Sequence, residues 1–558
     1  MTFPKISFKK LVLSIITFGT AFHLSAQTIS VDDNYAQEIG RIRQVLGKDS
    51  SGFSFSVRPM DLYQDSLLNR LAGSRNLAGD TSVYSPGIVF RILPVSLLSE
   101  YNLNRPYGYN NGPLYPNRGL QELFSTGFYF RLGFLKVQAK PEFVYAQNKS
   151  FPDFADVQGG NDNARLMQSY FAIVNGIDAP ERFGNSPLQK FYPGQSKVTL
   201  NFGKVEIGVS TENMWWGPGV KNSIMMSNSA PGFLHWTFNS SAPVKTSIGT
   251  FEWQLIGGYL NQSGYLPTDT NKLIYGHNLF MPKPSVTRYL SAYTINWHPK
   301  WMTGFFVGFS EYSYMNIDSM YRHYGLIKKI IPVIAGSSNQ ANTVTANSNG
   351  DNEDFAFAIN FRQVFEKEKA EIYFEWARND HWANLSDLLQ EPEHSSAYTL
   401  GGRKLYDLAG GRFIQVKLEL THLQNSPTYL LREEPTWYVH LQAPQDGYTN
   451  DGRYVGAGIG PGSNSLMLDL SYINGENTFG LQLERFVHDN DLYYNTFSGT
   501  NTFSQHWVDI AGTFYANYKA NCFLISSELT PVYTYNYEYK KGDSFNLHAR
   551  INLTYYFN

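Results

Sequence analysis

The last fifteen residues of the chain, Ser544–Asn558, read SFNLHARINLTYYFN, and apolar and polar side chains alternate along them. Successive side chains of a β-strand point to opposite faces, so this segment has one apolar and one polar face. The apolar face carries Ala549, Ile551, Leu553, Tyr555 and Phe557, and the polar face carries His548, Arg550, Asn552, Thr554 and Tyr556. Such a strand needs lipid on one side and water on the other, which a transmembrane β-barrel provides.

The first 26 residues have the pattern of a secretory signal peptide. Three lysines precede the mostly apolar stretch Leu11–Phe22, and small residues ending at Ala26 precede a predicted cleavage site before Gln27. The apolar stretch is too short to span a bilayer, and no later segment has about eighteen consecutive apolar residues. A mature protein in a membrane is therefore expected to cross it as a barrel.

The composition agrees with a barrel in the outer membrane. The 558 residues include 38 Tyr, 39 Phe and 10 Trp but only 16% charged residues, while the mean hydropathy is −0.32. Aromatic girdles around a polar-lined barrel explain this mixture, whereas a secreted β-sandwich or propeller has no need for so many aromatic rings. Without residues 1–26 the chain is mildly acidic, so no nucleic-acid partner is expected.

The segment after the signal peptide differs from the rest of the chain. Tyr35, Ile39, Ile42 and Leu46 fall at helical spacing, and Gly47 follows, so one amphipathic helix is predicted. We expect residues 27–86 to form a helical plug at or inside the periplasmic mouth, or a loosely attached spacer. The barrel itself is assigned to residues 87–558.

From Gly87 onward, alternating runs recur, and the connections between them are short and long in turn. Short connections are predicted at 132–135, 201–204, 242–249, 298–301, 366–369, 425–428, 474–477 and 519–521. Long ones are predicted at 104–125, 148–196, 211–232, 261–287, 316–352, 380–412, 441–464 and 488–505, with a tight hairpin at 540–543. Short periplasmic turns and long external loops are typical of outer-membrane barrels. The count predicts an all-β antiparallel transmembrane barrel of about 18 strands, or 16 with boundary errors.

Several of these strands place charged residues on the predicted inner face. Arg362, Glu371, Glu375, Lys417 and Glu419 all alternate with apolar neighbours. A barrel of this size is wide enough for a watery lumen, so we expect these charges to be hydrated or paired with one another.

The sharpest local motif is Thr211–Gly219, TENMWWGPG. By the strand count it lies at the extracellular end of the fifth strand. Trp215 and Trp216 offer flat rings on a sharply turned backbone, and Glu212 and Asn213 offer hydrogen bonds to sugar hydroxyls. The alternative is that the two tryptophans belong to the outer aromatic girdle.

These residues also resemble a known family. The run Ser210–Trp253, with WWGPG and Ser227–Pro231, is similar to the Wzi family of capsule assembly proteins in their Bacteroidetes-type form. Further similar stretches are Pro180–Gly184, Gly452–Gly456, Gly458–Ser465 and Leu483–Phe486, so that the resemblance extends over most of the mature chain. It implies a barrel of about eighteen strands with a small helical element closing the periplasmic side. It also implies a surface lectin that holds capsular polysaccharide or exopolysaccharide on the cell.

A second candidate loop is rich in glycine. Residues 452–462 do not fit a nucleotide-binding loop, because no strand and helix surround them and no lysine follows. The loop either folds into the barrel mouth, where glycine permits unusual backbone angles, or lets a polysaccharide approach closely. Arg453 and Asn464 at its edges, together with Tyr107 and Tyr109 of an earlier long loop, complete the candidate polysaccharide contacts.

No catalytic or metal site is predicted. Asp380 and His381 with Glu391, Glu393 and His394, and His488 with Asp489 and Asp491, lack the spacing of zinc or calcium motifs and read as solvated loops. The single cysteine, Cys522, excludes an intrachain disulfide.

The sequence therefore predicts a non-enzymatic, monomeric barrel without a cofactor, in contact with outer-membrane lipid and lipopolysaccharide, that binds polysaccharide. The alternatives are a porin or channel for solute or polysaccharide, and a barrel enzyme that acts on lipid or glycan.

Overall fold

The computed structural model describes most of the chain, in ten pieces. These are residues 28–49, 51–61, 88–159, 163–323, 353–379, 389–426, 434, 436–440, 446–497 and 504–557. The predicted signal peptide, residues 1–26, lies outside the described residues.

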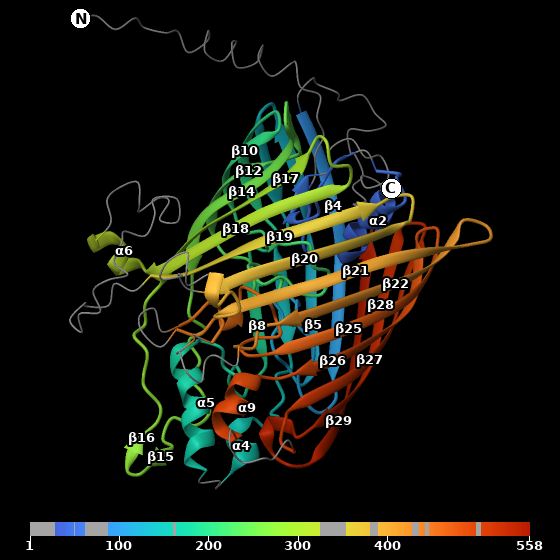
Figure 1. Cartoon of the computed structure of the whole chain (residues 1–558). Helices are drawn as coiled ribbons and strands as arrows, with labels where there is room; N and C mark the ends of the chain where they lie inside the picture. The colour runs from blue at the N-terminus through green and yellow to red at the C-terminus, as the bar shows by residue number, and fades with distance from the viewer. Residues whose placement is uncertain are drawn as a thin grey trace, which may run out of the picture.

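The chain forms one closed antiparallel barrel of 18 strands (Figure 1), as predicted. The last strand, β29, pairs antiparallel with the first barrel strand, β4, and this pairing closes the cylinder. The uninterrupted strands are β4 (Ile88–Asn102), β5 (Gly119–Leu132), β10 (Val205–Ser210), β14 (Gly249–Leu260), β17 (Arg288–Pro299), β18 (Phe305–Asn316), β19 (Asp354–Phe365), β20 (Ala370–Asn379), β21 (Ser396–Leu408), β22 (Arg412–His422), β25 (Asn464–Asn474), β26 (Asn477–Val487), β27 (Val508–Ala520), β28 (Phe523–Tyr535) and β29 (Asp543–Tyr555). The others are interrupted once each: β6 and β7 (Leu135–Ala139, Glu142–Ala146), β8 and β9 (Leu188–Tyr192, Lys197–Phe202), and β12 and β13 (His235–Ser240, Val244–Thr246).

The two ends of the barrel differ. Short turns join the strands at one end, which also carries helix α2 (Asn34–Val45) and the C-terminus (Figure 1). Long loops join them at the other end, where α4 (Phe154–Gln158), α5 (Ala164–Gly176), α9 (Asn490–Phe497) and the 3₁₀ turn η2 (Tyr537–Tyr539) gather. α6 (Ile317–His323) follows β18, and β15 (Leu273–Ile274) and β16 (His277–Asn278) form a small outlying hairpin.

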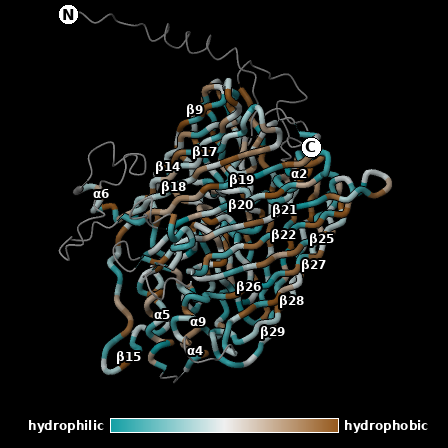
Figure 2. The backbone as a smooth tube through the Cα atoms, viewed as in Figure 1, coloured by the Kyte–Doolittle hydropathy of each residue, from teal (hydrophilic) through white to brown (hydrophobic). Residues whose placement is uncertain are grey.

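The outer face of the barrel is apolar, and the two faces of β29 lie as predicted. Ile551 and Leu553 are 55% and 40% exposed, whereas His548 and Tyr556 are each 4% exposed. The same alternation of apolar and polar residues runs along the other barrel strands (Figure 2). Aromatic pairs lie near the short turns, among them Phe134 with Phe202 and Trp297 with Trp301. An apolar belt with an aromatic edge identifies a membrane-spanning barrel.

Seven of the predicted short connections coincide with turns of the structure, but the prediction at 425–428 is wrong. The turn lies at 409–411, between β21 and β22, and β21 occupies part of the predicted long loop 380–412. Gly401 and Gly402 lie within β21. Gly401 is needed there because a Cβ atom would lie 2.4 Å from the ring of Tyr373 on the neighbouring strand. The predicted number of strands is still correct, because the error missed β21 and assumed one other strand in its place.

Helix α2 lies inside the barrel at the short-turn end. Asp33 caps it by accepting a hydrogen bond from the backbone N–H of Ala36 at 3.0 Å. Its apolar stripe, including Ile42 and Val45, packs against inward side chains of β18, β19, β21 and β25. The predicted helix is therefore confirmed, and its stripe is buried against the barrel wall.

The polar side of α2 completes an ion-pair network with the inner wall. The Glu371 carboxylate accepts a hydrogen bond from Arg362 at 2.8 Å and forms ion pairs with Arg41 of the helix at 2.8 Å and with Arg403 at 2.7 Å. Glu38 of the helix contacts Arg403 at 3.0 Å and Lys417 at 3.2 Å. Of the predicted inward charges, Arg362, Glu371 and Lys417 are thus paired, and their partners come from the N-terminal segment as well as from the wall.

Much of the interior is filled by the chain, which corrects the expectation of a watery lumen. Residues 211–234, 436–440 and 446–463 fold inward and place Trp216, Ile224, Trp437, Tyr438 and Tyr448 in a buried apolar cluster. Small inward residues of the wall make room for these loops: Ala292, Ala356, Ala358, Ala377 and Ala397. An 18-stranded cylinder is too wide for its own wall side chains to fill, so the loops fill it.

Replacing Glu371 with glutamine tests this packing. Glu371→Gln removes the carboxylate shared by Arg41, Arg362 and Arg403 and leaves three buried cations clustered. We expect the free energy of unfolding to fall by about 3 to 5 kcal/mol, measured by denaturant titration of the protein in lipid vesicles.

Glu368→Gln in the exposed β19–β20 turn is the matched control, and it should change the stability little. Equal stability of both variants would show that the network does not hold the plug.

Candidate functional site

The WWGPG motif lies inside the barrel and not on an external loop. Trp216 is 0% exposed and Trp215 is 4% exposed, and the two form β11, which pairs with β2 (Val57–Arg58) of the N-terminal segment. The Trp216 indole N–H donates to Gln254 Oε1 at 2.9 Å, and the guanidinium of Arg58 covers the Trp215 ring at 4.7 Å. The motif follows the fifth barrel strand, β10, as predicted, but the prediction of an external loop is wrong because both rings are buried.

The Gly-Pro-Gly turn after these tryptophans anchors the plug. Arg41 donates to the Pro218 carbonyl at 2.7 Å, and Arg58 donates to the carbonyls of Gly217 and Gly219 at 3.1 Å each. On the far side, the Glu419 carboxylate of β22 accepts the backbone N–H groups of residues 220, 221 and 222 at 2.7 to 3.0 Å. Gly217 has φ +128°, and a Cβ atom on Gly219 would lie 1.9 Å from the Asn222 carbonyl oxygen. The motif is thus explained by architecture.

Glu212 and Asn213 are also buried. Glu212 accepts from Gln138 at 3.0 Å, and Asn213 donates to the Ala230 carbonyl at 2.6 Å. These hydrogen bonds hold the start of the inward loop 211–234 to the wall. In this arrangement both side chains are occupied by protein partners.

Arg453 joins two loops, and Asn464 begins β25. Arg453 is 5% exposed and donates to the carbonyls of Pro113 and Leu114 at 2.6 and 3.0 Å and to the Tyr192 hydroxyl at 2.9 Å. Asn464 is half-buried and donates to Gln424 Oε1 at 2.8 Å. The glycine-rich loop therefore folds inward, which is one of the two alternatives that the sequence left open.

Tyr107 and Tyr109 point inward from the loop 103–118. Both hydroxyls donate to the Glu484 carboxylate of β26, and the ammonium of Lys221 lies 4.7 Å from the centre of the Tyr109 ring. Together with Trp215 they line a cavity inside the barrel. Three of the eight predicted contact residues are therefore brought together, and the other five are not.

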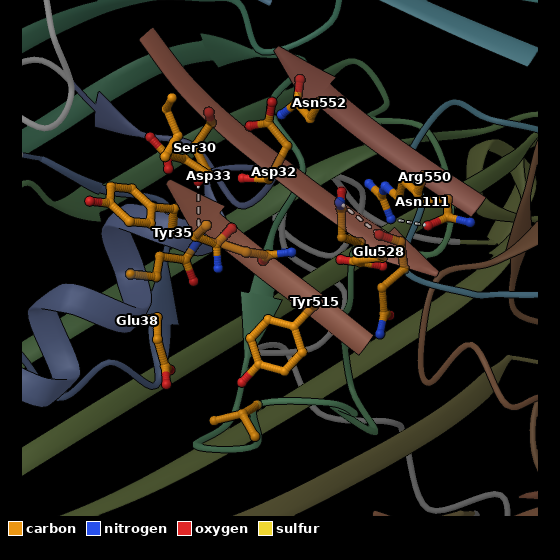
Figure 3. Close-up of a pocket in the computed structure, with 18 of the residues that line it drawn as sticks. Ser30, Asp32, Asp33, Tyr35, Glu38, Asn111, Tyr515, Glu528, Arg550 and Asn552 are labelled. Atoms are coloured by element: carbon orange, nitrogen blue, oxygen red, sulfur yellow. Dashed lines mark hydrogen bonds between the residues drawn. The ribbon is translucent and has the colours of Figure 1, made fainter. Parts of the chain in front are cut away.

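This interior cavity has a volume of about 360 Å³ and a strongly polar lining. Figure 3 shows Asp32, Asp33 and Glu38 of the N-terminal segment on one side and Glu528 and Arg550 of the barrel wall on the other. Arg550 donates to Asn111 Oδ1 at 2.8 Å. The loop 103–118 lines the cavity on the side away from the short turns, with Tyr107, Gly108 and Asn110 among its lining residues.

A second cavity, of about 240 Å³, lies at the long-loop end among α5, α9, η2 and the loop 261–287. Its lining includes the rings of Tyr170, Tyr454 and Trp507. Tyr265 and Leu266 on its rim are 37% and 67% exposed, so the cavity is open to the surface. We call it the loop-end cavity. No spacing pattern in the sequence predicts it, because its lining residues come from several separate segments of the chain.

Carboxylates surround the loop-end cavity. Glu181 accepts from the Phe154 backbone N–H at 2.9 Å and from the Tyr170 hydroxyl at 2.7 Å, and burial raises its pKa to about 6. Asp489 caps α9 through the Leu492 N–H, and burial raises its pKa to about 7. Burial and the neighbouring charge of Asp489 raise the pKa of Asp491 well above its usual value. These groups hold protons at a pH where exposed carboxyls are ionised.

The clusters considered for metal binding have other partners. His488 Nε2 contacts Asp509 at 2.9 Å, and His394 Nδ1 contacts Glu434 at 2.8 Å, while Asp380 and His381 lie outside the described residues. Among the described residues, no group of three or more His, Cys, Asp or Glu is placed to hold a metal ion. Within the same residues, no helix is both long and apolar enough to cross a membrane.

The fold has a counterpart among solved structures. The chain is similar to Wzi of Escherichia coli, described as an outer-membrane protein involved in group 1 capsule assembly and a carbohydrate-binding β-barrel. The match covers 96% of this chain and 100% of Wzi at 11% sequence identity, with a TM-score of 0.58. The chain has the fold of Wzi. The resemblance to the Wzi family noted in the sequence is thus confirmed in the fold.

Other solved structures match less closely than Wzi. OccAB4 of Acinetobacter baumannii matches 84% of this chain and 97% of its own at 10% identity, with a TM-score of 0.39. OprB of Pseudomonas putida matches 84% and 94% at 10% identity, with a TM-score of 0.35. No family model and no curated protein matches the sequence.

The raised carboxyl pKa values at the loop-end cavity predict that the local stability of α5 and α9 depends on pH. Folding raises the pKa of Glu181 and Asp489, so the stabilisation from their protons is complete below about pH 4 and is lost as the pH rises through 6 to 7. Hydrogen exchange of α5 and α9, corrected for the intrinsic rate, should therefore show about tenfold less protection at pH 8 than at pH 5.

In Asp489→Asn/Asp491→Asn this difference should shrink, because asparagine keeps the helix cap without the titrating group. Helix α2 serves as the internal reference. Protection of α5 and α9 that is equal at both pH values, or greater at pH 8, would contradict the assignment.

Proposed function

We propose that the protein is a non-enzymatic, monomeric outer-membrane barrel that binds capsular polysaccharide or exopolysaccharide at its long-loop end and holds it at the cell surface. In this proposal the signal peptide is cleaved near Ala26, residues 27–86 form the periplasmic plug, and the long loops are extracellular. The carrying observation is that the N-terminal helix and the inward loops occupy much of the barrel interior, while an aromatic, carboxylate-lined cavity opens among the long loops.

The filled interior argues against passage of solute or polysaccharide. The plug helix, the inward loops and the wall share buried ion pairs and hydrogen bonds, such as Arg41 to Pro218 and Glu419 to the 220–222 backbone. Opening a path would expose buried charges without their partners, which is costly. The porin alternative therefore has less support than binding at the surface.

The loop-end cavity has the chemistry of a glycan site. Sugar rings present C–H faces that pack on aromatic rings, and Tyr265 and Tyr454 border the cavity. Sugar hydroxyls donate hydrogen bonds to carboxylates, and Asp178 and Glu181 supply these acceptors. The volume of the cavity limits one site to a few sugar units. Firm retention of the polysaccharide would therefore come from many weak contacts along the repeating polymer and from neighbouring copies of the protein.

The similarity to Wzi supports the same proposal, because Wzi is described as a carbohydrate-binding barrel of capsule assembly. The membrane-spanning belt supports contact with outer-membrane lipid and lipopolysaccharide.

Removal of the rim aromatic rings tests the function. Tyr265→Ala and Tyr454→Ala each delete a ring that would pack on sugar, so we expect retention of the cell's own polysaccharide to fall about tenfold in the double variant. The measurement is polysaccharide retained on intact cells after washing, at equal surface levels of the protein.

Tyr275→Ala is the matched control, since Tyr275 is 86% exposed and lies on the same loop but outside the cavity lining. Undiminished retention in the double variant, or an equal loss in the control, would remove the loop-end cavity from the proposal.

A further inference from the structure

We infer that the loop-end cavity selects glycans with unsubstituted amino groups, whose ammonium would be held by the Glu538 carboxylate. This inference rests on the proposed function and names the class of polysaccharide. It begins from Glu538 of η2, which lines the cavity and is 5% exposed.

Glu538 has no partner for its carboxylate. Among the described residues, no side chain or backbone N–H donates a hydrogen bond to it and no cation pairs with it, although its own carbonyl accepts from Gln158. A buried carboxylate without a partner is unfavourable, so the site gains most from a ligand that brings a positive charge and N–H donors.

The nearby cations are engaged elsewhere. Arg105 pairs with Asp509 at 3.6 Å and donates to Ser544 and Thr534. Arg182 pairs with Asp153 at 3.3 Å and with Asp156 at 3.0 Å. The charge of Arg105 favours ionisation of Glu538, but the hydrogen bonds and ion pairs of both arginines go to other residues.

The rest of the lining is rich in acidic side chains, and burial favours their protonated forms. Asp178, Glu181 and Asp489 line the same cavity, and the charges of Glu181 and Asp153 oppose ionisation of Glu538. Lys283 donates to the Ile177 carbonyl and is the remaining lysine of the lining. An ammonium in the cavity would favour the ionised form of these carboxyl groups and pair with it, whereas a uronate or other anionic sugar would oppose that ionisation.

The backbone at Glu538 is held in an uncommon conformation. Asn536, Glu538 and Tyr539 have φ values of +51°, +53° and +60°, and Asp489 across the cavity has +25°. Non-glycine residues in this region are strained, and such residues gather at binding sites. The strained backbone at η2 is therefore the conformation in which Glu538 lines the cavity.

A protonated amine on a sugar fits this site better than a metal ion. Among the described residues no group of carboxylates and histidines is arranged to hold a metal ion. The adjacent rings of Tyr454 and Trp507 offer faces for a sugar and for cation–π contact with its ammonium.

The test is calorimetric binding of three oligosaccharides of equal length to the purified full chain in detergent at low ionic strength. These are a glucosamine hexamer, the same hexamer fully N-acetylated, and a uronic acid hexamer. We expect the glucosamine hexamer to bind about tenfold more tightly than the N-acetylated hexamer and the uronic acid hexamer to bind least. Glu538→Gln, which keeps the size of the side chain, should remove this preference, and Glu393→Gln in an exposed loop should keep it.

Equal or tighter binding of the N-acetylated or uronic acid hexamer to the wild type would overturn the inference and leave the proposed function standing. A preference for glucosamine that persists in Glu538→Gln would also overturn it. Failure of all three hexamers to bind, together with unchanged retention in the rim variants, would overturn the proposed function as well.

Discussion

The interior volume of a wide barrel is the constraint on which the rest of this structure depends. Eighteen strands enclose more space than their own side chains fill, so the space holds either water or other parts of the chain. Here the turn Gly217–Gly219 is fixed between Arg41 and Arg58 on one side and Glu419 on the other. This clamp ties the N-terminal segment, an inward loop and the barrel wall into one packed body.

The same clamp determines which polar groups remain for a ligand. Inside the barrel, carboxylates such as Glu371 and Glu419 are satisfied by guanidinium groups or backbone N–H groups. At the loop end, Glu538 is buried without such a partner, and the backbone around it is strained. A buried polar group without a hydrogen-bond partner indicates a ligand-binding site better than a residue that is only polar or aromatic.

The sequence predicted the elements that depend on local pattern. The two-faced strand Ser544–Asn558, the number of strands and the helix beginning near Asp33 follow from periodicity, because each needs only a period of two or 3.6 residues. The turn at 409–411 was missed, and the strand before it contains Gly401, whose place is set by the Tyr373 ring on the next strand and by no local pattern.

The candidate site was harder to predict for a physical reason. The tryptophans of WWGPG were interpreted as exposed, but contacts about 160 to 200 residues away in sequence draw their turn into the barrel. The loop-end cavity combines residues from α5, α9, η2 and two loops, and no spacing in the sequence reports such a meeting. The inward folding of the glycine-rich loop was one of the alternatives that the sequence left open. Tyr107 and Tyr109 were expected at the outer surface, but they line the cavity inside the barrel.

The most direct test of the central claim, that the chain fills its own barrel, is the conductance of the purified full-length protein in a planar lipid bilayer. The account predicts no steady open channel, because the plug helix and inward loops remain clamped to the wall. A large, stable, ohmic conductance from the wild-type protein would contradict it.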